Sequence, residues 1–117
     1  MIKAIAFIKK RADISTQEFR DYYETKHAPL IDVLLPYYAT YRRNYVDGPV
    51  RAGTEAFAFD VVTELEFATA EDYAAWQAAL ADPDTLAKIR ADEAHFVAPG
   101  QTRMYVVSAF ESDYSGR

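Results

Sequence analysis

The sequence of 117 residues contains no cysteine, which excludes several classes of protein at once. Disulfide frameworks, catalytic thiolates and cysteine-ligated zinc or iron–sulfur sites all need a thiol. The chain therefore suits a reducing compartment, and we expect a cytoplasmic location. Only two histidines occur, and they lie far apart in the sequence, so we expect no metal site.

Glycine and clustered basic residues are scarce as well. All four glycines fall in expected loops or in the tail, so no glycine-rich loop can hold the phosphates of NAD or ATP, and we expect no cofactor. The net charge is −5, and apart from residues 9–11 and 42–43 the lysines and arginines are scattered. Such a chain has no basic stripe for a nucleic acid. No apolar run approaches the length of a membrane span, so we expect no membrane partner.

The sequence is, in contrast, rich in apolar and aromatic residues. Hydrophobic residues make up 50% of the sequence and aromatic residues 15%, including nine tyrosines, which indicates a folded globule. We expect one domain over residues 1–110 and a polar tail over 111–117. Tyrosine combines a large apolar area with a hydroxyl group, which suits a pocket for a flat, mostly apolar ligand. The alternative is that the tyrosines fill the core and an interface.

Alternating apolar residues predict four strands, over residues 2–9, 37–46, 57–67 and 102–110. The first of these is apolar on both faces, which is typical of a strand that is covered on both sides. One face of the third strand is expected to hold Phe57, Phe59, Val61, Leu65 and Phe67.

Two helical regions separate these strands. Ser15 is followed three residues later by a glutamate, the spacing of a capping box, which predicts that a helix begins there. Pro29 disfavours helical geometry in the residue before it, so we expect this helix to stop or bend sharply just beyond His27. The second region is expected to begin at Thr69 and to restart at Asp82, which precedes a proline.

The order strand, helix, strand, strand, helix, strand predicts an α+β fold, the ferredoxin-like βαββαβ arrangement with an antiparallel sheet. Both helical regions must then lie on one face of that sheet. The other face still carries apolar side chains from the first strand, and an exposed apolar face of this size usually marks an interface. We therefore expect a homodimer in which two sheets pack face to face and form a barrel.

The residues F-R-D-Y-Y-E-T-K-H-A-P-L at positions 19–30 resemble the motif of the EthD family. Further segments resemble other parts of the family pattern: residues 2–10, 59–60, 64–65 and 92–96. The resemblance implies ferredoxin-like subunits of the dimeric α+β barrel superfamily. It also implies auxiliary roles in oxidative degradation, or cyclase, dehydratase or decarboxylase activity in polyketide-type pathways.

The resemblance implies that His27 lies at the mouth of a cleft between the sheet and the first helix, with Asp60 near the same space. Histidine titrates near neutrality, so His27 is a candidate general acid or base towards a carbonyl compound. The alternative for His27 is a structural role, in which it caps the last carbonyl groups of the helix. Asp60 is the second candidate catalytic residue, and its alternative is an ion pair with an arginine of a neighbouring strand.

We expect a small enzyme that acts on an apolar carbonyl or aromatic compound by cyclisation, dehydration, isomerisation or cofactor-free oxidation. His27 would transfer the proton and Asp60 would orient it or balance its charge. The candidate ligand contacts are Phe19, Tyr22, Tyr23 and Tyr41. Of these, Tyr23 shares a helix face with His27 and is expected to position the ligand. The alternatives are a non-catalytic module that sequesters a hydrophobic small molecule in the same cleft, and a structural dimer without a ligand.

Overall fold

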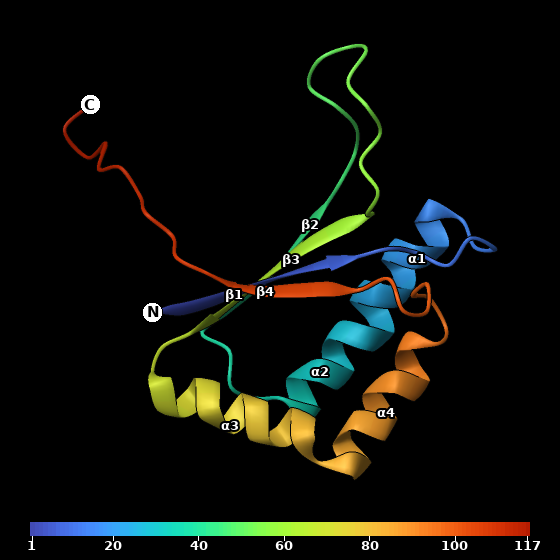
Figure 1. Cartoon of the computed structure of the whole chain (residues 1–117), viewed down its shortest axis with the longest axis vertical. Coiled ribbons are helices and arrows are strands. Elements are labelled where there is room, and N and C mark those ends of the chain that lie inside the picture. The colour runs from blue at the N-terminus through green and yellow to red at the C-terminus, as the bar shows by residue number, and fades with distance from the viewer.

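The computed structural model describes residues 1–117 and contains one four-stranded antiparallel sheet in the order β2-β3-β1-β4 (Figure 1). The strands are β1 (Ile2–Ile8), β2 (Thr40–Tyr45), β3 (Val61–Phe67) and β4 (Arg103–Val107). Strand β3 pairs with β1 and β2, and β1 also pairs with β4. The predicted ferredoxin-like α+β fold is confirmed.

The helices connect these strands in two groups. The first group, α1 (Thr16–Tyr22), η1 (Tyr23–His27) and α2 (Ala28–Leu34), runs end to end, and the second consists of α3 (Ala70–Ala81) and α4 (Pro83–Glu93). Figure 1 shows α2, α3 and α4 on the same side of the sheet, as the sequence predicts. None of the helices combines the length and the apolar character that a membrane crossing requires.

The helix starts lie where the sequence predicts them. Ser15 accepts a hydrogen bond from the backbone N–H of Glu18, and the Glu18 carboxylate accepts one from the N–H of Ser15, both at 3.0 Å. Thr69 and Asp82 each accept a backbone N–H three residues further on. These bonds satisfy donors that have no partner inside the helix, which is why short polar side chains mark the starts.

Of the predicted stop or sharp bend just beyond His27, the stop is wrong, because the chain stays helical to the end of α2. The N–H of Ala28 bonds the carbonyl of Tyr23, the longer spacing of a π-turn. Pro29 then falls in the first turn of α2, where a missing N–H costs little. The π-turn η1 therefore lets the helix pass a proline that would otherwise end it.

The strands are shorter than their alternation predicts. Strand β2 begins at residue 40 rather than 37, β4 spans residues 103–107 rather than 102–110, and β3 begins at residue 61 rather than 57. Asp60 explains the late start of β3. Its N–H donates to the carbonyl of Ile8 at 2.9 Å, and its carboxylate accepts the N–H of Lys10 at 2.8 Å.

Phe57 and Phe59 consequently lie on the other face of the sheet from the one predicted. Their rings pack against Phe7, with centroids 6.2 Å and 5.6 Å away. Phe7 alternates with residues of β1 that are buried under the helices, so this aromatic group lies on the face without helices. Figure 1 shows the connection between β2 and β3, and the segment after β4, extending away from the sheet.

The core between sheet and helices consists of two clusters. The first packs Phe19 and Tyr23 from the helix against Phe96 and against β1 and β3. The second surrounds Trp76, which is 5% exposed, with residues from α2, α4 and the sheet. Separate clusters under a single sheet leave room for a pocket where they meet.

Candidate active site

A pocket of about 680 Å³ opens where the two clusters meet. Of its 23 lining residues 16 are hydrophobic, and they come from the sheet, η1, α2, α3, α4 and the segment before β4. This volume is typical of sites that bury a drug-sized ligand. An apolar lining with a few polar groups means that the polar groups decide orientation and chemistry.

His27 reaches this pocket from η1 and is only 5% exposed. Its Nδ1 lies 2.7 Å from Oδ2 of Asp92 at the end of α4. Its ring packs edge-on against Tyr23, with centroids 5.2 Å apart, and lies 4.9 Å from the ring of Phe96. When Nδ1–H donates to the carboxylate, the lone pair sits on Nε2, which has no hydrogen-bond partner in the protein.

Asp92 is itself held by a second partner. Its Oδ1 accepts a hydrogen bond from the hydroxyl of Tyr22 at 2.7 Å. Burial, together with the neighbouring carboxylate, raises the pKa of Tyr22 to about 12, so this phenol remains a donor at neutral pH. Both oxygens of Asp92 therefore have fixed partners, and the carboxylate fixes the orientation of the imidazole.

Burial lowers the pKa of His27, and the hydrogen bond to Asp92 opposes this shift only in part. The balance favours the neutral ring, since burial penalises the charged form. The helix continues beyond His27, so the preference for a protonated ring that a helix C-terminus would provide does not apply. A neutral imidazole can accept a proton, so His27 is a candidate base rather than a candidate acid.

Residues 11–100 match the family model of the EthD domain. The chain belongs to the EthD family. No curated protein matches the chain.

Three solved structures resemble this EthD protein over nearly its whole length. An EthD family protein from Bacillus halodurans is 21% identical, with 94% of this chain and 99% of that chain covered and a TM-score of 0.64. An EthD-like protein from Ralstonia eutropha is 16% identical, with coverages of 97% and 96% and a TM-score of 0.67. A dimeric protein of unknown function and ferredoxin-like fold from Bacteroides fragilis is 12% identical, with coverages of 92% and 95% and a TM-score of 0.57. At these identities the likeness establishes the fold.

Glu93, the neighbour of Asp92, also lines the pocket of this EthD protein. Its carboxyl group has no ion pair, and burial raises its pKa, with Asp92 adding to the shift and Arg90 opposing it. A raised pKa for an acid and a lowered pKa for a base in one pocket are the conditions under which a carboxyl group donates a proton and an imidazole accepts one. Glu93 is therefore a candidate acid in the same pocket as His27, the candidate base.

Three hydroxyl groups form a hydroxyl cluster on the pocket wall: those of Tyr23, Tyr41 and Thr63. Tyr41 donates to the hydroxyl of Tyr23 at 3.1 Å, and the Tyr23 hydroxyl lies 3.0 Å from Oγ1 of Thr63. Burial raises the pKa of Tyr23, so its phenol stays protonated. Tyr41 and Thr63 bring their hydroxyl groups from the sheet, and Tyr23 brings its hydroxyl group from η1.

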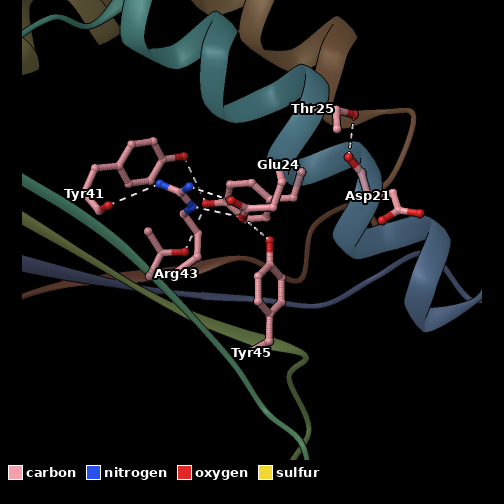
Figure 2. A network of polar contacts seen from close by, with 8 residues as sticks. Asp21, Glu24, Thr25, Tyr41, Arg43 and Tyr45 are labelled. Atoms are coloured by element: carbon pink, nitrogen blue, oxygen red, sulfur yellow. Dashed lines mark hydrogen bonds and ion pairs between the residues drawn. The ribbon is translucent and has the colours of Figure 1, made fainter.

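A second polar network lies behind this wall. Figure 2 shows Arg43 between Tyr41 and Glu24, with the hydroxyl of Tyr45 directed at the same glutamate. The Arg43 guanidinium donates to both Glu24 oxygens, at 3.0 Å and 2.6 Å, and lies 4.7 Å from the ring centre of Tyr41. The bidentate ion pair joins η1 to β2, and neither Arg43 nor Glu24 lines the pocket.

The structure separates the residues that the sequence proposed together. His27, Tyr23 and Tyr41 line one pocket, whereas Phe19 is fully buried in the first cluster and does not reach it. Tyr22 contacts Asp92 rather than the pocket. The carboxylate of Asp60 is engaged by a backbone N–H at the end of β1, and Asp92 takes the place beside His27 that was expected for it.

Asp92, Glu93 and Thr63 are the site residues that sequence reasoning missed. A signal existed for Asp92, because it follows buried Ile89 by three positions and thus lies on the inward face of α4. Nothing local marks Thr63, which is one of several residues of alternating β3. No group of three or more histidine, aspartate or glutamate side chains is arranged to hold a metal ion.

Proposed function

We propose that this EthD protein catalyses cofactor-free proton transfer on an apolar carbonyl compound, with His27 as the general base. The single observation that carries the proposal is the His27–Asp92 pair, which leaves Nε2 without a protein partner on a ring that lines an apolar pocket. We assign to Asp92 the orienting role that was expected of Asp60, and to Tyr23 a role at the pocket wall.

In this mechanism Nε2 of His27 removes a proton from the carbon next to the ligand carbonyl, and the electron pair moves to the carbonyl oxygen. The carboxylate of Asp92 stabilises the imidazolium that forms. Return of the proton to another carbon gives an isomerisation. If protonated Glu93 delivers its proton to a departing hydroxyl instead, the step is a dehydration. Both outcomes conserve protons and need no oxidant.

Deuterium exchange into 2-tetralone, a bicyclic ketone with acidic C–H groups, tests this proposal without knowledge of the natural substrate. Proton NMR in D₂O follows the loss of the C–H signals. We expect the protein to accelerate exchange above the buffer rate and His27→Gln to remove about 10²-fold or more of that acceleration. His95→Gln is the matched control, because His95 is the other histidine, is exposed and does not line the pocket.

The second candidate function is a binding module that sequesters an apolar compound without turnover, which the size and lining of the pocket equally favour. It predicts that the protein binds 2-tetralone but gives no exchange above the buffer rate. That result would refute the catalytic proposal. A purely structural dimer predicts no pocket beside His27, and the pocket argues against it.

We also propose that the protein assembles as a homodimer through the sheet face without helices, closing a barrel. Ile5, Phe7, Val62 and Tyr105 give this face an apolar centre, and the ferredoxin-like relative from Bacteroides fragilis is dimeric. Light scattering after size exclusion should give twice the mass of one chain, and Phe7→Asp should give the mass of one. A single-chain mass for the wild type at high concentration would contradict the proposal.

A further inference from the structure

One of the three hydroxyl hydrogens in the hydroxyl cluster has no hydrogen-bond acceptor in the protein. Tyr23, Tyr41 and Thr63 carry three hydroxyl hydrogens, but only two hydrogen bonds connect them, and none of the three hydroxyls bonds any other protein group. Whichever of Tyr23 and Thr63 donates to the other, one hydrogen remains without an acceptor in the protein.

This unused donor is buried. Tyr23 is 1% exposed and Thr63 is 2% exposed, and both line the pocket. A donor that is withdrawn from bulk water needs an acceptor, because leaving it unpaired is costly. Because both residues line the pocket, a ligand in the pocket can supply this acceptor.

The hydroxyl of Thr63 and the imidazole of His27 lie on different walls of the pocket. Thr63 lies on β3, in the sheet wall of the pocket, whereas His27 lies on η1, in the helix wall. Tyr23 connects the two, since its hydroxyl contacts Thr63 and its ring contacts the ring of His27. A flat ligand between the walls can therefore present an oxygen to the sheet and a carbon to the imidazole.

We propose that the hydroxyl cluster is an oxygen-binding subsite, and that the substrates of this protein are apolar ring compounds with a ketone or enolate oxygen. This proposal rests on the proposed function, because it assigns the place of the carbonyl oxygen whose neighbouring carbon loses a proton to His27. A free hydroxyl donor strengthens its bond as negative charge develops on that oxygen.

The test compares 2-tetralone with tetralin, which has the same rings and no oxygen. Calorimetry gives both affinities, and infrared spectroscopy gives the carbonyl stretch of bound 2-tetralone. We expect the ketone to bind about tenfold more tightly than the hydrocarbon, the effect of one hydrogen bond, and its stretch to lie below the value in hexane. Equal affinities, or a stretch as in hexane, would overturn the subsite even without any variant.

The variant Tyr23→Phe/Tyr41→Phe/Thr63→Val removes all three hydroxyls and nearly keeps their shapes. It should bind tetralin unchanged and lose the ketone preference and the stretch shift. Thr63→Val alone should keep the preference, because the free hydrogen then belongs to Tyr23. Tyr45→Phe is the control, since its hydroxyl contacts Glu24 and lies outside the pocket lining. A triple variant that folds and retains the preference would refute the subsite.

The two proposals fail in different ways. His27→Gln should lose deuterium exchange but retain the ketone preference and the stretch shift. A wild type with the stretch shift but no exchange refutes the catalytic role and supports the subsite. A wild type with exchange but no stretch shift supports the base and overturns the subsite.

Discussion

The two faces of the sheet are built from alternating residues of the same strands, yet one carboxyl group on each side is held in a different way: Glu64 of β3 on the open face and Glu93 of α4 under the helices. On the face without helices, Lys3 and Arg42 both pair with Glu64, and the ion pair and hydrogen bonds lower the pKa of that carboxyl group to about 2. Under the helices, Glu93 has no ion pair and burial raises its pKa. A paired carboxylate stabilises structure, whereas a buried unpaired one is available for chemistry.

The aromatic residues on the two sides of the sheet differ as well. Phe7, Phe57 and Phe59 gather on the open face as exposed or half-exposed apolar surface, which suits association. Under the helices Tyr23 and Tyr41 bring hydroxyl groups into a pocket. The open face therefore suits the proposed homodimer, and the covered face suits the proposed ligand.

The largest effect should come from Asp92→Asn on the covered face. An amide that donates to Nδ1 of His27 would move the ring proton to Nε2, so Nε2 would lose the lone pair with which it can accept a proton. We expect the 2-tetralone exchange rate to fall by about 10²-fold. Asp84→Asn, an exposed change on the same helix, is the control. An unchanged rate in Asp92→Asn would show that the pair does not set the tautomer.

The pH dependence of exchange tests the same face with a smaller effect. Burial lowers the pKa of His27 below its ordinary value of 6.5, so the neutral base should persist as the pH falls through 6.5. The exchange rate should keep its plateau at pH 6.5 and decline only below it. Below pH 6.5 the unfolded chain binds a proton that the folded one resists, so this histidine should also reduce stability there. A rate that is already halved above pH 6.5 would contradict the shift.

The sequence predicted features that depend on neighbouring residues. The helix starts are visible because a side chain and its backbone partner lie three positions apart, and His27 is visible because it sits in a family motif of adjacent residues. The partner of His27 was not predictable in this way, since Asp92 lies 65 positions away and meets it only after folding. The faces of Phe57 and Phe59 were mispredicted because backbone bonds of Asp60 interrupt the strand, which alternation cannot reveal.

The smallest effect should come from Glu64→Gln on the open face. The ion pair with Lys3, at 2.5 Å, is partly exposed, so the loss at pH 7 should be about 1 kcal/mol of unfolding free energy. The folded pKa of Glu64 is depressed to about 2, so its contribution is present above pH 4.5 and lost as the pH falls towards 2. Urea unfolding of the wild type and the variant at pH 7 and at pH 2 measures this loss of unfolding free energy. Glu66→Gln, on the same strand face without an ion pair, is the control.

Because η1 is a π-turn, the direction of the His27 imidazole depends on the number of residues in that turn. Each residue of an α-helix advances the side-chain direction by about 100°. Deleting Thr25, an exposed residue of that turn, would remove the extra residue that the wider turn accommodates, so the residues beyond it would move along the helix and change direction relative to α1. Every functional group would survive such a deletion, and the ring of His27 would no longer point at Asp92.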